Sequence, residues 1–241
     1  LPLNSIAVEK SRIAENGDYN LSGDRYKDSI TKKHSKFDAD IQTFKPLDVA
    51  MDYGAKINTL VVGQPDGVVG NRYNIINAMF AKSPKTAVTL AHEFCTYYQF
   101  HIKKVINYYY DHTAMYPDAV RTTTFADEVT KAFEDNGWTV NRIYCGQAPK
   151  HDTKYVYFDK VFKEEDNRLP IIRINKENCL YLITSILMAG AVEGRKGIEK
   201  DKRPERKLNA VDEETTHFSD AFDTLVFNKF KDGLTQVGYL M

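Results

Sequence analysis

The chain has 241 residues, of which 42% are hydrophobic, 12% aromatic and 27% charged. A chain of this length and composition can bury a substantial core, which excludes a wholly disordered protein and a machine of many domains. Its 33 Lys and Arg residues balance its 33 Asp and Glu residues, so net charge gives no general attraction to nucleic acid and any such binding must depend on local patches.

Cysteine spacing and hydropathy predict the redox state of the thiols and whether the chain crosses a membrane. Cys95, Cys145 and Cys179 form no CxxC pair, so we expect three reduced thiols in the core. The longest stretch without a charged residue, 178–192, is shorter than the ~20 apolar residues that cross a bilayer, so we expect no membrane span. The chain begins Leu-Pro-Leu-Asn-Ser, without Met or a basic segment, which indicates an intracellular protein cut from something longer.

The first part of the chain predicts a polar arm followed by strands. Residues 1–46 are polar and poorly periodic and suit a linker or arm. Two short apolar runs, 47–54 and 57–64, predict an antiparallel hairpin, and a third run at 73–81 follows a turn. We therefore expect three consecutive strands.

The pattern then alternates between helices and strands. Apolar residues at helical spacing follow Ser83, the expected N-cap, and Pro84, expected in the first turn. A β-branched and aromatic run at 105–110 predicts a fourth strand. A second helix at 124–136 and a fifth strand at 138–145 come next.

The remainder is less regular. A connection rich in Lys and Asp contains one possible strand at 155–158, and 170–174 predicts a further short strand. Asn175 is the expected cap of the next helix. Residues 195–207 predict an exposed, mobile, cationic loop, and 219–230 predict the last helix.

This order predicts one α/β domain over 47–241, preceded by the arm at 1–46. The expected fold is ribonuclease H-like, with a central mixed β-sheet whose first three strands are antiparallel and which is flanked by helices.

The predicted order of strands and helices places three carboxylates at one edge of the sheet. Asp52 closes the first strand, Asp111 is the first acid after the fourth strand, and Asp220 lies in the first turn of the last helix. Converging carboxylates repel one another unless a divalent cation neutralises them. Two Mg²⁺ or Mn²⁺ ions on such oxygens hydrolyse phosphodiesters, so we predict these three residues to be catalytic metal ligands.

Other readings of the acids remain open. An isolated Asp at a strand end is commonly a turn former or a helix cap. Asp223, one helical turn after Asp220, is a candidate fourth metal ligand or a partner of the ligands. Glu93 rivals Asp111 as the second acid, although the apolar stripe of its helix turns it towards solvent. His217 and His112 are candidates for orienting water or contacting phosphate, or are structural hydrogen-bonding groups.

A basic segment precedes the third acid and is the predicted contact for the DNA backbone, with a solvated charge run as the alternative. Its members are Lys196, Lys200, Lys202, Arg203, Arg206 and Lys207.

The segment 216–225, Thr-His-Phe-Ser-Asp-Ala-Phe-Asp-Thr-Leu, resembles the final acidic motif in the C-terminal nuclease domain of tailed-bacteriophage large terminase subunits. Segments 47–64 and 106–113 resemble that domain's first and second acidic motifs, and the likeness covers about 47–230. The resemblance implies a metal-dependent endonuclease that cuts concatemeric double-stranded DNA during genome packaging, with Asp52 as the shared metal ligand.

The same resemblance implies partners and a location. Large terminases carry an ATPase domain, but no GxxxxGK[ST] occurs in this chain, so that domain is absent from it and is an expected partner. The portal and the small terminase subunit are further expected partners, no membrane is involved, and the expected location is the cytoplasm of the bacterial host of a phage or prophage. Two alternatives share the fold: a non-catalytic docking module for a portal or capsid partner, and a junction resolvase or integrase core.

Overall fold

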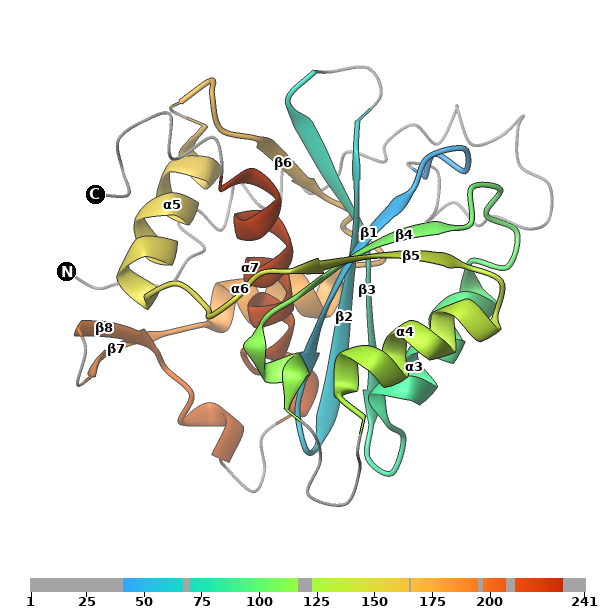
Figure 1. Ribbon diagram of the computed structural model, residues 1–241. Helices are drawn as coiled ribbons and strands as arrows, with labels where there is room; N and C mark the ends of the chain where they lie inside the picture. Colours follow the sequence, from blue (N-terminus) through green and yellow to red (C-terminus); the bar gives the residue numbers. More distant parts are fainter. Residues whose placement is uncertain are drawn as a thin grey trace.

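The computed structural model describes residues 41–66, 70–116, 123–164, 166–194, 197–206 and 211–231. Most of the expected N-terminal arm lies outside these ranges, so the predicted boundary at residue 46 stays a prediction. Within them, six strands form one sheet with helices on both faces (Figure 1). The strands are β1 Leu47–Tyr53, β2 Ile57–Pro65, β3 Arg72–Lys82, β4 Val105–Tyr110, β5 Thr139–Tyr144 and β6 Ile171–Ile174.

The strand order is β5-β4-β1-β2-β3-β6. Strands β1, β2 and β3 pair antiparallel, whereas β4 lies parallel to β1, β5 parallel to β4 and β6 parallel to β3. The predicted fold class is confirmed as a central mixed α/β sheet that begins with three antiparallel strands and is flanked by helices. Because β4 pairs with β1, the carboxyl ends of these two strands meet at one edge of the sheet.

Helices divide between the two faces of the sheet (Figure 1). One face is covered by α3 Ala87–Tyr97 and α4 Phe125–Asp135, and the other by α5 His151–Lys163, α6 Leu180–Met188 and α7 His217–Phe230. Strand β1 contributes side chains to the cores on both faces of the sheet. Val49 and Met51 pack in the core with α3 and α4, whereas Ala50 packs in the core with α7.

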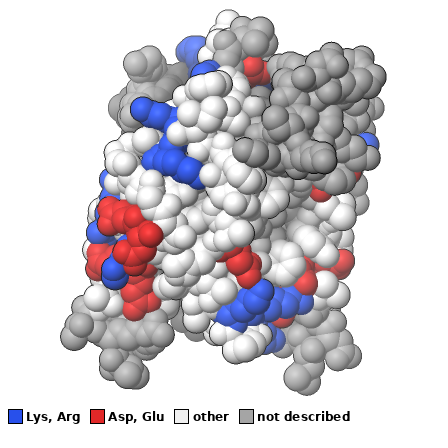
Figure 2. Space-filling view, turned by 90° about the vertical axis from the view of Figure 1, so that its right-hand side faces the viewer, with Lys and Arg blue, Asp and Glu red and all other residues white. Residues whose placement is uncertain are grey.

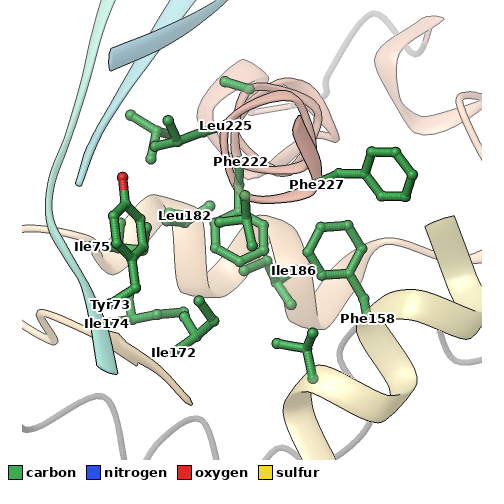
Figure 3. Close-up of a cluster of buried hydrophobic side chains, with 14 of the residues drawn as sticks. Tyr73, Ile75, Phe158, Ile172, Ile174, Leu182, Ile186, Phe222, Leu225 and Phe227 are labelled. Atoms are coloured by element: carbon green, nitrogen blue, oxygen red, sulfur yellow. The ribbon is translucent and has the colours of Figure 1, made fainter. Parts of the chain in front are cut away.

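The core on the α7 face fixes the position of that helix. Phe222 of α7 packs on Phe158 of α5 with ring centroids 5.4 Å apart, and Figure 3 shows Leu182 and Ile186 of α6 beside them. Each aromatic side chain buried in this way contributes about 1.5–3 kcal/mol to stability. The first turn of α7 is thereby held beside β1 and β2.

A buried carboxylate ties the other end of α7 to the sheet. Asp48 of β1 is 1% exposed and accepts hydrogen bonds from Tyr73 Oη at 2.8 Å and Asn107 Nδ2 at 2.7 Å. Lys229 Nζ, near the end of α7, lies 2.8 Å from Asp48 Oδ2. The charge of Asp48 is fully partnered, so this acid has a structural role.

Two expected helix caps were wrong. The N-cap of α3 is Thr86, whose side chain accepts from Thr89 N, because Ser83 and Pro84 belong to the turn in which Lys85 N donates to Lys82 O. Asn175 lies in a turn before α6, where its Oδ1 accepts from the backbone of Glu177 and Asn178. The second expected helix is α4, with Thr124 as its cap.

The possible strand at 155–158 was also wrong, since these residues lie inside α5. The aromatic and β-branched run Tyr155–Phe158 suggests a strand by local propensity, but the buried residues recur at helical spacing. They are Lys154, Tyr157, Phe158, Val161 and Phe162.

The expected exposed loop at 195–207 contains ordered structure. Strands β7 Ala191–Gly194 and β8 Gly197–Lys200 form an antiparallel hairpin outside the main sheet (Figure 1). A short 3-10 helix, Pro204–Arg206, follows it. The hairpin ends at Lys200, which is 6% exposed, so this lysine is buried rather than free in solvent.

None of the helices in the described ranges is long and apolar enough to cross a membrane. The three cysteines are free thiols, and burial raises the pKa of Cys95 to about 12, which keeps its thiol protonated and unreactive.

Candidate active site

Asp52 and Asp111 lie at the carboxyl ends of two neighbouring parallel strands. Ala50 of β1 is in register with Tyr109 of β4, and both side chains belong to the core beneath α7. Asp52 lies two residues beyond Ala50 within β1, whereas Asp111 follows the last residue of β4 and begins the next 3-10 helix. The sheet therefore brings the ends of β1 and β4 together, but within the described residues no contact joins Asp111 to Asp52 or Asp220.

Asp111 also caps the 3-10 helix His112–Met115. Its Oδ1 accepts from Thr113 N at 2.9 Å and from Thr113 Oγ1 at 2.5 Å. Among the described residues no hydrogen bond to Oδ2 is found, which leaves that oxygen available for a ligand. Asp111 can therefore cap the 3-10 helix with one carboxylate oxygen and bind a ligand with the other.

Asp52 is held by a residue from the start of α7. Its Oδ2 lies 2.7 Å from His217 Nδ1, and its side chain is 26% exposed. Burial raises the pKa of Asp52, the His217 hydrogen bond opposes that effect, and the negative charge of Asp220 adds to it. Burial acts to lower the pKa of His217, but the hydrogen bond and charge of Asp52 outweigh burial and raise it.

Asp220, in the first turn of α7, accepts from two lysines. Lys200 Nζ lies 2.7 Å from its Oδ1 and Lys202 Nζ 2.5 Å from its Oδ2. Burial alone would raise the pKa of Asp220, but the two ammonium charges overcome it and hold the pKa far below its usual range. The carboxylate is therefore ionised and partnered.

Asp223, one helical turn further on, is 2% exposed and lies between two ammonium groups. Lys154 Nζ from α5 and Lys200 Nζ from β8 are both 3.0 Å from its Oδ2. Its Oδ1 is buried without a hydrogen-bond partner. These acids and their partners are called the acid–lysine cluster below; it comprises Asp52, Lys154, Lys200, Lys202, Glu205, His217, Asp220 and Asp223.

The donor chemistry of the cluster fits a hard divalent cation. The carboxylate oxygens of Asp52, Asp220 and Asp223 are of the type that hard divalent cations prefer, and Asp223 Oδ1 is buried without a hydrogen-bond partner. As arranged here, however, no group of three or more His, Cys, Asp and Glu side chains in the described residues is set to hold a metal ion. Lysines supply the positive charge that surrounds Asp220 instead.

The residues predicted to contact DNA differ widely in how far their side chains are exposed to solvent. The side chain of Lys202 is 43% exposed, and that of Arg203 is exposed and donates two hydrogen bonds to Asp201 through its guanidinium. Lys200 is not exposed, as a backbone contact requires, because the acids of α7 draw its ammonium inward. Arg206 ends the 3-10 helix Pro204–Arg206, and Lys196 and Lys207 lie outside the described residues.

Glu93 lies on α3, across the sheet from the acid–lysine cluster, and pairs with Lys85 at 2.6 Å. The structure therefore separates it from Asp52. His112 follows Asp111 directly, and its ring packs on Tyr116 with centroids 5.8 Å apart.

Sequence reasoning missed the contact between His217 and Asp52 and the membership of Lys154 in the cluster. The partnership of His217 with Asp52 joins residues 165 positions apart, so no local pattern marks it. Lys154 lies at helical spacing from the buried apolar residues of α5. Had this helix been predicted from the sequence, the spacing would have placed Lys154 on its buried face.

A pocket of about 370 Å³ opens on the opposite face of the sheet from the acids. It is lined by Tyr53, Asn58 and Phe125, and the rings of Tyr53 and Phe125 stack at 5.2 Å. Figure 2, which looks at the side of the molecule where α3 and α4 lie, shows Lys, Arg, Asp and Glu in small mixed groups with uncharged surface between them. The visible part of this side shows no broad cationic field of the kind that DNA binding needs.

Comparison with known proteins gives weak likenesses. No protein-family model matches this chain, and no curated protein matches it. Among solved structures, it is similar to Thermus thermophilus RuvC, with 11% identity and a TM-score of 0.36, covering 78% of this chain and 96% of that one. It is also similar to T. thermophilus RuvC in complex with Holliday junction substrate, with 9% identity and a TM-score of 0.34, covering 81% and 98%. Likenesses of this strength assign no family and no activity.

Proposed function

We propose that this chain is a nuclease domain that hydrolyses phosphodiester bonds of double-stranded DNA with Mg²⁺ or Mn²⁺. The observation that supports the proposal is that the parallel strands β1 and β4, which Asp52 closes and Asp111 follows, lie side by side, and that the start of α7, with Asp220, lies at the end of β1. The negative charge of Asp220 adds to the effect of burial in raising the pKa of Asp52, which supports a common site for the two carboxylates.

Each residue has a proposed task in this reaction. Asp52, Asp111 and Asp220 would hold two ions, with Asp52 shared, and the bound ions would activate a water and stabilise the leaving oxygen. His217 fixes the orientation of the Asp52 carboxylate through its 2.7 Å hydrogen bond. Asp223, the fourth predicted ligand, positions Lys154 and Lys200 beside the ligands. Lys202 and Arg203 are exposed enough to contact the DNA backbone.

The finer proposal is a large terminase nuclease domain. It is supported by the motif resemblance at 47–64, 106–113 and 216–225, which supply the end of β1, the end of β4 and the start of α7. Its partners would be a terminase ATPase domain, the portal and the small terminase subunit, in the cytoplasm of a bacterial host.

The test is a plasmid-nicking assay with Mn²⁺, run with and without a chelator. We expect the parent chain to convert supercoiled plasmid to the open circle and Asp52→Asn to lose about 100-fold or more of that rate. Asp135→Asn is the matched control, because Asp135 is an exposed acid on α4 whose only described ion pair is with Lys131. Equal rates for parent and Asp52→Asn would refute the site. Preference for a four-way junction over plasmid and linear duplex would favour a resolvase-type core over a terminase.

A non-catalytic docking module is the second candidate, and the lysine neutralisation of Asp220 and Asp223 favours it. A module of that kind would show no nicking and no saturable Mn²⁺ binding. Those two measurements separate it from the nuclease.

A further inference from the structure

The pocket on the α3 and α4 side of the sheet is large enough for a small molecule. Its volume of about 370 Å³ lies within the ~300–1,000 Å³ range of small-molecule sites. It is formed where the turn between β1 and β2, the turn after β3 and the first turns of α3 and α4 meet. None of the residues that line it belongs to the acid–lysine cluster.

Asn58 presents a polar group to this pocket. Tyr53 and Asn58 lie directly opposite one another on β1 and β2, so their side chains point to the same face, and Tyr53 packs against the core beneath α3 and α4. Asn58 is 9% exposed, and its side-chain amide has no hydrogen-bond partner among the described residues. A buried amide without a partner costs stability. Its NH₂ group and its oxygen are therefore available to a ligand that presents an acceptor and a donor side by side.

Two aromatic rings form an apolar wall of the pocket. Tyr53 and Phe125 stack with ring centroids 5.2 Å apart and planes inclined by 21°. The hydroxyl of Tyr53 is engaged by the hydroxyl of Tyr108, so Tyr53 offers the pocket its ring rather than a free polar group. Ring surfaces of this kind favour a flat, aromatic ligand.

The charged groups around the pocket favour a neutral ligand. Lys85 and Glu128 are the charged residues that line it, and their formal charges cancel. Lys85 also pairs with Glu93 at 2.6 Å, which further weakens its attraction for an anion.

Hydrogen-bonding groups stand on two sides of the pocket. Ala87 and Val88 are the first two residues of α3, so their backbone N–H groups have no acceptor within the helix. Glu128 supplies carboxylate oxygens, one of which accepts from Thr123 Oγ1 at 3.0 Å. Together with the amide of Asn58, these groups suit a flat heterocycle that has both ring acceptors and an amino donor.

We propose that this pocket binds a single unstacked nucleobase with an exocyclic amine, of which adenine is the model. The base packs against the rings of Tyr53 and Phe125, and its amine and adjacent ring nitrogen pair with the amide of Asn58, as an Asn amide pairs with the N6 and N7 atoms of adenine. The base is supplied by a free nucleoside or by an unpaired position of a DNA strand. The inference goes beyond the proposed function, because it concerns the opposite face of the sheet and holds whether or not the chain cuts DNA.

The first test follows the NMR signals of the ¹⁵N-labelled parent chain during titration with adenosine. We expect shifts in the side-chain NH₂ of Asn58 and in the backbone N–H of Ala55 and Val88, and none in Glu199 of the β7–β8 hairpin. Purine riboside, which lacks the exocyclic amine, should bind about tenfold more weakly. Absence of shifts at the pocket, or equal affinity for the two nucleosides, would overturn the proposal.

The second test measures adenosine binding by calorimetry in Asn58→Leu. We expect the Kd to rise about tenfold or more. The melting temperature should equal or exceed that of the parent, because the amide has no hydrogen bond within the protein to lose. Asn141→Leu, on the exposed part of β5, is the matched control and should leave the Kd unchanged. An unchanged Kd in Asn58→Leu, or a lower melting temperature that reveals a structural role for Asn58, would count against the base-binding site.

The source of the base is determined by repeating the NMR titration with single-stranded oligo-dA and with an abasic strand of the same length. Shifts of the Asn58 NH₂ group with oligo-dA but not with the abasic strand assign the pocket to an unpaired base of a DNA strand. Shifts with adenosine alone assign it to a free nucleoside, and both results support the proposal. If neither oligo-dA nor adenosine shifts these signals, the proposal fails, whereas loss of plasmid nicking with these shifts intact would refute the proposed function alone.

Discussion

His217 Nδ1 lies 2.7 Å from Asp52 Oδ2, and this contact joins the first residue of α7 to the end of β1. The contact links the part of the candidate site at the end of β1 directly to the part at the start of α7. Thr59 of β2, which is in register with Asp52, adds a second link by donating to the backbone oxygen of His217 at 3.1 Å. The start of α7 is thereby fixed over the strand ends.

The ion pair gives a pH dependence whose sign follows from the raised pKa of His217. A histidine with a raised pKa in the folded state stabilises the fold fully below its unfolded pKa of about 6.5, and this stability is lost as pH rises through the folded value. We expect His217→Gln to lower the free energy of unfolding by about 1–2 kcal/mol at pH 6 and by less at pH 9. Urea titrations at both pH values measure this, and an equal loss at both would contradict the charged pair.

The second acid can be identified by comparing Asp111 with Glu93. Asp111→Asn keeps the cap, because Asn is an equally good N-cap, but removes the charge from the strand end. We expect it to reduce Mn²⁺-dependent nicking by about 100-fold. Glu93→Gln, on the other face of the sheet, should leave the rate within a few-fold of the parent. Loss of nicking in Glu93→Gln alone would transfer the site to α3.

Asp223 and Lys154 form a buried ion pair. Its contribution to stability can be measured separately from metal binding. Removing one partner of an isolated buried pair costs about 3–5 kcal/mol, and Lys200, the second partner of Asp223, should make the cost here smaller. We expect Lys154→Met to be destabilised, and Lys154→Met/Asp223→Leu to regain part of the loss. Thermal melts of the single and double variants give the coupling energy. Additive losses would show that the two charges do not depend on each other.

Lys202 and Arg203 are the exposed members of the basic segment. Replacing both with Ala should weaken DNA binding and reduce the slope of log K against log salt by up to about two counterions. Titrations of a labelled duplex at several salt concentrations, with Mn²⁺ replaced by Ca²⁺ to avoid cleavage, measure the slope. Lys131→Ala on α4 is the control, and an unchanged slope in the double variant would leave the segment without a role in DNA binding.

The sheet could be predicted from the sequence because its signals are local. The runs that became β1 to β5 carry β-branched and aromatic residues between clear turns, so Asp52 and Asp111 were placed correctly at strand ends. Residues Tyr155–Phe158 give the same local signal inside α5, where packing on α7 decides the outcome instead. Propensity without burial cannot separate these two cases.

The burial of Lys200 could not be predicted for a different reason. Its immediate neighbours are charged, and a basic run of this kind is commonly solvated. The acids that draw it inward lie 20 and 23 positions away and reach it only when α7 packs on the sheet. The partner of a buried charge is a property of the tertiary fold.

The chain order of the elements determines when the site can exist during synthesis. Strands β1 to β3 form a local meander, and β4 joins them before α5, α6 and α7 have been made. A nascent chain that ends before residue 217 has Lys154, Lys200 and Lys202 without the two acids that neutralise them, and Asp52 without its histidine. Because domains fold progressively as they are translated, the arrival of α7 is the final step. The acid–lysine cluster therefore forms only after the carboxylates on α7 have emerged from the ribosome, and a shorter nascent chain lacks it.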